Sequence, residues 1–375
     1  MKRETLKQRR RRLRREKAIR SCTRIAVCVI AALALVTVGW KIAAPFLGDS
    51  YGQAETGNDG QKGPIAEVQA AENEDGSGNA GIAQLAETTE VPYEAPGWQY
   101  DNTGWWYAVS DTTYYQNGFA VIDDKTYHFD SSGYLSVGWT PIGGKGYYFD
   151  ENGVYDPEKD HSMMIALTFD DGPDAHTGEL LDTLKQYGAK ATFFLQGVNI
   201  EQYGGEAIAR MASEGHLIGN HSYDHPNMLK LSAEDAATQF QKTDDLIAQY
   251  NNGSGASVVR FPYGNKSKEL EAIAARPCFM WDVDTMDWES RNVQSNIQAV
   301  LNGVEPGQII LMHDIYQATV EACKTIIPEL VSRGYELVTL DTLAAASGVE
   351  LQNSVTYYGF SQADIDAGNV SDAEN

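Results

Sequence analysis

Two short stretches of the sequence place acids and histidines at spacings that suit metal chemistry. The first, TFDDGP, ends an apolar run on Asp170 and Asp171. Side chains alternate along a strand, so the two acids would point apart unless Gly172-Pro173 turns the chain and brings both to one rim. The second stretch, HSYDH, holds His221 and His225 four residues apart, on one face if the segment opens a helix. Two crowded carboxylates need a cation or a shared proton nearby, and a histidine pair offers ligands for such a cation.

Together these residues predict a metal site of two histidines and one carboxylate, with positions left open for water and substrate. One acid would bind the metal and the other would act as a base. Either histidine alone could instead be a buried structural residue, but the pair follows an apolar run directly. We expect zinc first, and such a site also accepts cobalt, nickel or manganese.

Three further motifs could complete the site. RFPYG supplies Arg260, a cation that could hold a carboxylate ionised, and DTMDW adds two acids and an aromatic wall. LMH ends an apolar run on His313, which is well placed to be a general acid. Taken singly, Arg260 could be a surface residue, Trp288 a core residue and His313 a buried donor. Their joint placement after apolar runs favours a functional site.

The elements that would position these motifs alternate from Met163 onward between apolar strands and helical patterns, which predicts a parallel sheet, either open or closed as a barrel. Active sites of such folds lie at the carboxyl ends of the strands, where the polar motifs stand. We expect strands to end at Phe169, Leu195, Gly219, Phe261, Val283, Met312 and Leu340. We expect helices over 206–213, 233–250, 293–301 and 320–333.

Residues 96–156 carry an internal repeat. Three Gly-aromatic pairs, which begin at Gly97, Gly118 and Gly138, are spaced 21 and 20 residues apart. Each is followed by an aromatic cluster and by Asp-Gly type turn residues, so we expect stacked β-hairpins whose aromatics are partly core. Exposed aromatic rings would bind sugar faces or quaternary ammonium groups. A rigid stalk is the alternative.

Charge is distributed unevenly along the chain. Residues 1–24 hold twelve Lys and Arg against two Glu, so the net charge of −23 for the chain leaves −33 for the remainder. That acidic bulk argues against nucleic acid as a partner. The apolar run 25–47 follows the basic head and predicts a single transmembrane anchor with everything after it outside the cell. A cleaved secretory signal is the alternative.

Two further segments read as polar and acidic, a spacer over 48–95 and a tail over 349–375. Four cysteines are too few for a disulfide scaffold. Cys278 and Cys323 lie in the globular part, where two separate buried thiols are the first expectation and a pair is the alternative. The oligomeric state cannot be inferred from the sequence.

Residues 163 to about 348 resemble the polysaccharide deacetylase family (NodB homology, carbohydrate esterase 4). The resemblance runs through all five motifs in order, TFDDGP, HSYDH, RFPYG, DTMDW and LMH. It implies a distorted (β/α) barrel for a catalytic domain over 160–348. The hairpin segment separately resembles cell-wall-binding repeats of the choline-binding and glucan-binding type, through its GW, aromatic triplet and D-x-x-G pattern.

The family resemblance also implies roles for the residues. Asp170 would be the catalytic base, and the metal ligands would be Asp171, His221 and His225. Arg260 would position the base. The remaining assignments are the backbone N–H of Tyr263 as an oxyanion donor, His313 as the acid tuned by Asp284, and a substrate groove lined by Trp288, Asp287 and Tyr263.

The implied reaction is hydrolysis of N-acetyl groups on an extracellular amino-sugar polymer, with N-acetylglucosamine of peptidoglycan as the first expectation. N-acetylmuramic acid, chitin oligomers, poly-N-acetylglucosamine and O-acetylated xylan remain alternatives. A protein that only anchors to the wall is the alternative of a different class. The presence of Asp170 and His313 argues against it, since a binder needs neither.

Overall fold

The computed structural model describes residues 81, 83–87 and 96–372, which all belong to one compact unit, Ile65–Asn375. The predicted basic segment 1–24, the predicted anchor 25–47 and most of the predicted spacer lie outside the described residues. Within the residues described, no helix is both long and apolar enough to cross a membrane. The anchor therefore stays a prediction.

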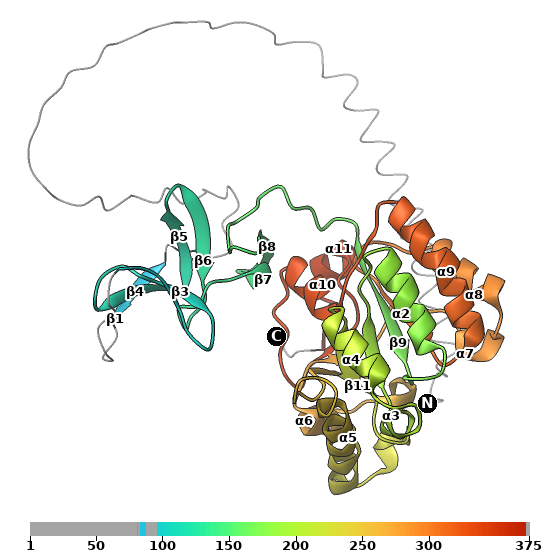
Figure 1. The fold of residues 1–375 in the computed structure, drawn as a ribbon. Coiled ribbons are helices and arrows are strands. Elements are labelled where there is room, and N and C mark those ends of the chain that lie inside the picture. Colours follow the sequence, from blue (N-terminus) through green and yellow to red (C-terminus); the bar gives the residue numbers. More distant parts are fainter. Residues whose placement is uncertain (1–80, 82, 88–95, 373–375) are drawn as a thin grey trace, which may run out of the picture. The chain divides into compact units, whose positions relative to one another are not determined.

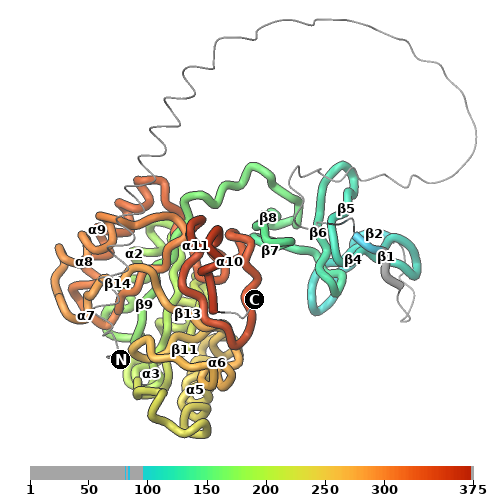
Figure 2. The backbone as a smooth tube through the Cα atoms, turned by 180° about the vertical axis from the view of Figure 1, so that it is seen from behind, coloured from blue at the N-terminus to red at the C-terminus, as the bar shows by residue number. Residues whose placement is uncertain are grey.

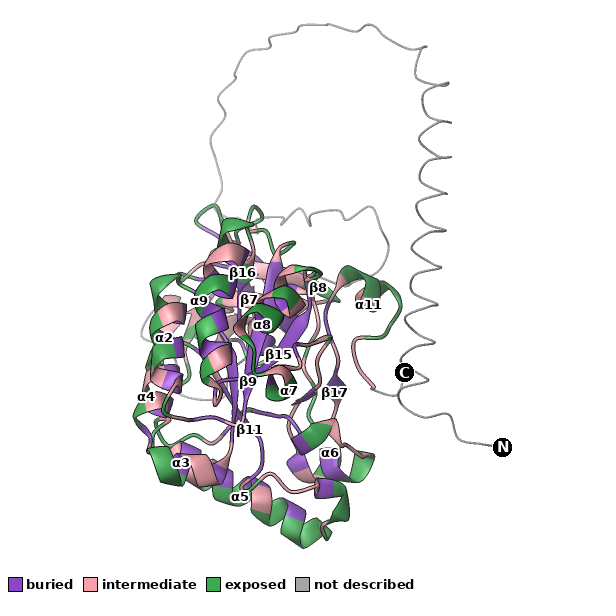
Figure 3. Cartoon of the chain, turned by 90° about the vertical axis from the view of Figure 1, so that its right-hand side faces the viewer, coloured by how far each residue is buried: buried purple, intermediate pink, exposed green. Residues whose placement is uncertain are grey.

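The second half of the chain folds around a parallel sheet whose strands are buried beneath helices (Figures 1 and 3). Its strands are β9 (Met164–Asp170), β10 (Thr192–Leu195), β11 (Leu217–Asn220), β12 (Val258–Val259), β13 (Cys278–Phe279), β14 (Val283–Asp284), β15 (Ile309–His313), β16 (Glu336–Leu337) and β17 (Thr356–Tyr357). The order is β14-β15-β9-β10-β11-β12-β13-β17, with β16 beside the start of β9. In the described part of the chain β14 and β17 do not pair, so the predicted barrel is a curled parallel half-barrel.

The helices follow the predicted alternation. They are α2 (Thr177–Gln186), α3 (Gly197–Tyr203), α4 (Glu206–Ser213), α5 (Ala233–Ala248), α6 (Lys268–Ala274), α7 (Asp287–Ser290), α8 (Val293–Leu301), α9 (Gln317–Ser332), α10 (Leu340–Ala346) and α11 (Gln362–Asp366), with 3-10 turns at Met228–Lys230 and Pro262–Gly264. The predictions for 206–213 and 293–301 coincide with α4 and α8. Side-chain oxygens of Ser232 and Asn292 accept backbone N–H bonds and begin α5 and α8.

Strand β9 is central because all seven of its residues are buried. Leu167 and Phe169 pack into the cluster that includes Leu180 and Ile326, while Met164 belongs to a second cluster on the other face. Apolar side chains on both faces are what a parallel sheet covered by helices requires, and each fully buried one contributes about 1.5–3 kcal/mol. This packing fixes the position of the residue that ends β9.

The segment predicted as an acidic tail from residue 349 is acidic, but where it is described it contributes a strand to the sheet and is not a separate tail. Strand β17 pairs with β13, as the red segment beside β13 shows in Figure 2. Thr356 Oγ1 donates a 2.7 Å hydrogen bond to the buried Glu271, and Lys266 pairs with both Glu271 and Asp372. The polar sequence around this strand suggested an exposed segment. Its acid Asp372 is instead neutralised by a lysine from another part of the chain.

Two other sequence expectations are settled by the sheet. The strand expected to end at Val283 lies in the run FMWDVD, residues 279–284, which is divided between β13 and β14, and these two are not neighbours in the sheet. Cys278 and Cys323 are both free and buried, so the expectation of separate thiols is confirmed.

Three hairpins precede the sheet, as the repeat predicts. Their strands are β2 (Gly97–Tyr100) with β3 (Trp105–Ala108), β5 (Gly118–Ile122) with β6 (Lys125–Phe129), and β7 (Gly138–Ile142) with β8 (Lys145–Phe149). The glycine that opens each hairpin has a positive φ, which explains why this repeat position is glycine. The Asp-x-x-Gly turns also repeat, because Asp130 and Asp150 each accept two backbone N–H bonds through Oδ1.

Most aromatic rings of the hairpins face one another. Trp98 contacts Tyr107 and Tyr127 edge-on at 5.2 and 4.9 Å, so neighbouring hairpins share a core. Tyr100 and Trp105 are instead 67% and 50% exposed, with ring centroids 5.0 Å apart. Strand β1 (Gln84–Glu87) pairs with β4 (Thr113–Gln116). It lies within the predicted spacer, so that prediction is wrong for these four residues.

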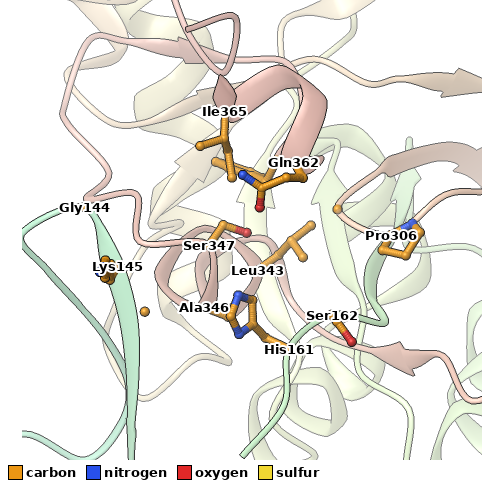
Figure 4. Close-up of a pocket in the computed structure, with 13 residues that line it drawn as sticks. Gly144, Lys145, His161, Ser162, Pro306, Leu343, Ala346, Ser347, Gln362 and Ile365 are labelled. Atoms are coloured by element: carbon orange, nitrogen blue, oxygen red, sulfur yellow. The ribbon is translucent and has the colours of Figure 1, made fainter. Parts of the chain in front are cut away.

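A cavity of about 550 Å³ lies between the tip of the third hairpin and the half-barrel (Figure 4). Lys145, His161, Leu343 and Gln362 are among its lining residues. His161 precedes β9 and Pro306 precedes β15, so this cavity lies at the amino ends of those strands. The predicted catalytic residues stand at the opposite, carboxyl ends, and the cavity is therefore not the candidate active site.

Candidate active site

The two acids of TFDDGP do reach one place at the end of β9. Asp170 is the last residue of the strand, and Asp171 has φ of +76°, which breaks the alternation of strand side chains. Asp170 Oδ2 lies 3.7 Å and Asp171 Oδ1 3.6 Å from Nε2 of His221. Asn199 Nδ2 donates a 2.7 Å hydrogen bond to the Asp171 carbonyl and holds the turned backbone. The predicted turn is confirmed.

The two histidines also meet there, although their segment is a loop and not the start of a helix. His221 directly follows β11, and its Nδ1 donates to the Arg260 carbonyl at 2.7 Å, which leaves Nε2 facing the acids. Positive φ values at Ser222 and His225 turn the loop back, so that His225 Nε2 lies 3.6 Å from Asp171 Oδ1. Loop geometry therefore replaces the helical spacing that was expected to bring them together.

Asp171, His221 and His225 fit a divalent metal. One ligand atom from each lies within 4.8 Å of the others, and the donors are two imidazole nitrogens and one carboxylate oxygen. Burial and the neighbouring His221 lower the pKa of His225, which favours the neutral imidazole that ligates metals. The hydrogen bond from His221 Nδ1 to a carbonyl is the outer contact that orients a ligating histidine.

Asp170 is held by a fully buried arginine. Arg260 Nη1 donates to Asp170 Oδ1 at 2.8 Å and to Thr168 Oγ1 at 2.7 Å. Its other nitrogens donate to the carbonyls of Phe279 and Met280. A buried charge pair of this kind costs about 3–5 kcal/mol when one partner is removed, so neither residue is free to move. Arg260 therefore holds Asp170 in place, which is the positioning role expected from the sequence.

His313 ends β15, and its partner is Asp287, so the assignment of Asp284 as the tuning acid is wrong. His313 Nδ1 lies 2.8 Å from Asp287 Oδ1, while Asp287 Oδ2 accepts from the His313 N–H and from Thr319 Oγ1. Asp284 instead accepts the Met286 N–H at 2.9 Å. Met286 has φ of +55°, which turns the chain so that Asp287 faces β15.

The Asp287 contact changes the acidity of His313. Burial disfavours the charged imidazolium, but the hydrogen bond and charge of Asp287, helped by the charges of Asp170 and Asp171, raise the pKa of His313 to about 9. His313 is therefore protonated at neutral pH. With Nδ1 committed to Asp287, Nε2 is the nitrogen that can give a proton to a substrate.

The three residues predicted to line the substrate groove differ in their exposure. Tyr263 has φ of +61°, is 65% exposed, and its ring lies 4.4 Å from that of His225. Its N–H has no hydrogen-bond acceptor among the described residues, which leaves it available to a ligand oxygen. Trp288 is 44% exposed and also suits a groove wall. Asp287 is fully buried and lines no groove.

Two residues of the site were not among the predicted ones, although Thr168 opens TFDDGP and Asp314 directly follows LMH. Thr168 accepts from Arg260 and donates to the Ile310 carbonyl at 2.7 Å. Asp314 is fully buried beside Gly172, where an added Cβ would meet its carboxylate at 2.6 Å, and its Oδ2 accepts from Thr177 Oγ1. Burial raises the pKa of Asp314 to about 7. An acid directly after a motif histidine was the available signal.

Comparisons with known proteins agree with this site. A family model described as polysaccharide deacetylase matches residues 158–277, which hold the acids and histidines of the metal site and Arg260. The peptidoglycan-N-acetylmuramic acid deacetylase PdaC of Bacillus subtilis is 42% identical over 184 residues, 49% of this chain and 39% of PdaC. A peptidoglycan-N-acetylglucosamine deacetylase of Bacillus cereus is 39% identical over 191 residues, 49% of this chain and 69% of that protein. The chain belongs to the polysaccharide deacetylase family.

A solved structure supports the family at the level of the fold. A T48 deacetylase with substrate is 39% identical, with a TM-score of 0.50, over 52% of this chain and 96% of that chain. The matched part of this chain corresponds to about two fifths of PdaC and of the deacetylase PgdA of Listeria monocytogenes. The family model begins at residue 158, after the hairpins, so their resemblance to wall-binding repeats stays a prediction.

Proposed function

We propose that the protein hydrolyses N-acetyl groups on an amino-sugar polymer outside the cell, with N-acetylglucosamine of peptidoglycan as its first substrate. The observation that carries this proposal is the placement of three groups at one edge of the sheet. These are the Asp171–His221–His225 cluster, Asp170 held by Arg260, and the protonated His313 held by Asp287. An amide needs both a base and an acid, since its nitrogen leaves only when protonated.

The chain's own residues divide the steps. A divalent cation on Asp171, His221 and His225, with zinc first and cobalt, nickel or manganese as alternatives, would polarise the acetyl carbonyl and lower the pKa of water. Asp170 takes the proton of the attacking water. The N–H of Tyr263 donates to the oxygen that becomes negative. Nε2 of His313 then protonates the departing amine, which leaves acetate and a free amino sugar.

The choice of polymer is supported by the relatives' names. The Bacillus cereus relative is described as a peptidoglycan-N-acetylglucosamine deacetylase, and PdaC as acting on N-acetylmuramic acid. N-acetylmuramic acid is therefore the second candidate. A test incubates the purified full chain with defined muropeptides and measures loss of acetyl groups by mass spectrometry. No loss from muropeptides or chito-oligosaccharides would contradict the proposal.

The cellular placement is a further part of the proposal. The apolar run 25–47 after twelve basic residues supports a single membrane anchor with the catalytic domain facing the wall, and secretion after cleavage is the alternative. The hairpins would hold the enzyme near an insoluble substrate, with the exposed rings of Tyr100 and Trp105 as the contact surface.

The hairpin role is tested with Tyr100→Ala combined with Trp105→Ala. Activity on purified sacculi should fall about two- to fivefold more than activity on a soluble chito-oligosaccharide. The hairpins would raise the local concentration of enzyme only at the insoluble substrate. Val121→Ala, an exposed apolar residue of β5, is the control. Equal effects on both substrates would make the hairpins a stalk.

A further inference from the structure

Arg291 is an exposed arginine that the reaction above does not use. It follows α7 and adopts φ of +46°. Its Nε donates to the Trp288 carbonyl at 2.9 Å, and its guanidinium carbon lies 3.3 Å from the ring centroid of Tyr316. These two contacts hold the planar guanidinium over an aromatic ring just after α7.

The position of Arg291 is tied to the catalytic acid. Tyr316 comes three residues after His313, and the two rings are 5.7 Å apart. Trp288 directly follows Asp287, which holds His313. A substrate that presents its acetamido nitrogen to His313 would therefore place its neighbouring substituents near Arg291.

No acid within the described residues neutralises Arg291. The other charged groups around the reaction centre have partners, since Arg260 pairs with Asp170 and His313 with Asp287. No carboxylate among the described residues lies within 4.0 Å of the Arg291 guanidinium, and its Nη1 and Nη2 have no hydrogen-bond acceptor there. Helix α9, which is 16 residues long, begins directly after Tyr316 without a side-chain cap, and its amino end adds partial positive charge.

We propose that Arg291, stacked on Tyr316 beside Trp288, forms a subsite for a carboxylate that the substrate carries next to the sugar being deacetylated. This inference rests on the proposed function and narrows its substrate class to anionic wall glycan. A guanidinium presents two parallel N–H groups that match a carboxylate, whereas an uncharged chitin oligomer offers no such group. In peptidoglycan the carboxylate belongs either to the lactyl group of muramic acid or to the peptide stem attached to it.

The test compares three substrates on the full chain. A chito-oligosaccharide carries no carboxylate, a peptide-free wall glycan carries the free lactyl carboxylate, and a muropeptide carries the carboxylates of its stem. The kcat/KM for acetate release is measured on each, for the wild type, Arg291→Gln and Arg291→Lys. Arg291→Gln should lower kcat/KM on at least one anionic substrate about three- to tenfold more than on the chito-oligosaccharide. Arg291→Lys keeps the charge but lacks the planar guanidinium. Its kcat/KM on that substrate should lie between those of the wild type and Arg291→Gln.

Arg333→Gln is the matched control. Arg333 is also exposed and also donates to a carbonyl, that of Leu301, but it follows the far end of α9. A 16-residue helix is about 24 Å long, so this control removes an equal charge without touching the subsite. Its ratio of activities between substrates should equal that of the wild type.

The outcomes separate the possibilities. A selective fall on peptide-free glycan assigns the lactyl carboxylate, and one on the muropeptide assigns the stem. If the lactyl group is the source, its methyl ester should lower wild-type activity and abolish the difference between wild type and Arg291→Gln. Equal losses on all three substrates would reduce Arg291 to a structural support of Trp288 and overturn the inference. Acetate release from none of them by the wild type would remove the proposed function, and the inference with it.

Discussion

The two flanks of the active site use the same kind of pair for opposite purposes. On the flank of β9 and β12, Asp170 pairs with Arg260, and on the flank of β15 and α7, Asp287 pairs with His313. Each pair joins a carboxylate to a cation at 2.8 Å in a buried setting. The partner of Asp170 cannot lose its proton in the working pH range, whereas the partner of Asp287 can.

This difference decides which member of each pair does the chemistry. Arg260 donates to Asp170 and has no proton to lose in this range, so the carboxylate is the member left to accept a proton. Asp287 instead keeps His313 charged, and the imidazolium is the member that can donate. In the proposed reaction, one kind of carboxylate–cation pair therefore supplies a base on one flank and an acid on the other, according to which partner titrates.

The largest expected effect comes from the base flank. Asp170→Asn removes the proton acceptor without removing a metal ligand, so kcat should fall about 10²–10⁴-fold while metal content stays near that of the wild type. His221→Ala should lose both activity and metal. Elemental analysis of the purified variants, together with acetate release, distinguishes the two. Full metal in His221→Ala or robust turnover by Asp170→Asn would contradict the assignment.

The acid flank predicts a change in pH dependence. Because Asp287 raises the pKa of His313 to about 9, the active protonated form exists below that pH and is lost as pH rises through it. In Asp287→Asn the burial of His313 is uncompensated, and its pKa should drop to or below the ordinary value of about 6.5. At pH 8 kcat/KM should therefore fall about ten- to thirtyfold, with a smaller loss at pH 6.

Asp284→Asn is the matched control for this prediction. Asp284 lies three residues earlier and accepts the Met286 N–H, but it does not contact His313. Its pH–rate profile should keep the alkaline limb of the wild type. An alkaline limb that moves in Asp284→Asn and not in Asp287→Asn would restore the pairing expected from the sequence.

The two flanks also differ in how far the sequence predicts them. Asp170 and Asp171 are adjacent to a turn signal, and Arg260 lies one residue before the strand end expected at Phe261, so strand-end reasoning brings all three to one edge of the sheet. The sheet order does the rest, since the carboxyl ends of parallel strands share one edge. This flank was predictable because its residues are fixed by regular strands.

The acid flank depends on an irregular turn that no sequence pattern predicts. DTMDW holds two acids, and which of them faces β15 is decided by the left-handed backbone of Met286, a residue that seldom adopts it. Strand β17 was missed for a related reason. It is two residues long, and its acidic surroundings are neutralised by Lys266 and Lys268, which come from α6 and the loop before it.

A smaller effect tests how rigidly the base is held. Thr168→Val keeps the shape of the side chain but removes one acceptor of Arg260 Nη1 and the donor to Ile310. We expect a three- to tenfold loss in kcat with little change in KM, because the orientation of Asp170 loosens while the groove is untouched. The free energy of unfolding should fall by about 1–2 kcal/mol.

Thr192→Val separates activity from stability in that experiment. Thr192 lies directly opposite Thr168 on β10, is equally buried, and accepts the Leu340 N–H at 3.1 Å. It should show a similar loss of stability without the loss in kcat. Equal kinetic losses in both variants would mean that Thr168 supports the fold and not the base.

The smallest effect concerns Asp314, which joins the two flanks because it follows His313 and packs against the glycine after Asp171. Its pKa is raised to about 7 by burial, whereas an unfolded aspartate titrates near 3.9. Between these values the unfolded chain releases a proton that the folded chain keeps, so this residue lowers stability as pH rises, by at most about 1.4 kcal/mol per pH unit. Below about pH 4 the penalty is absent.

Asp314→Asn should remove this penalty. Relative to the wild type, the free energy of unfolding should therefore rise by about 1–3 kcal/mol more at pH 8 than at pH 4. Urea denaturation at both values measures this, with the exposed Asp245→Asn as control. If the stability of Asp314→Asn depends on pH as that of the wild type does, the buried carboxyl does not keep its proton to a higher pH than an unfolded aspartate. Asp314 would then join the two flanks through packing alone.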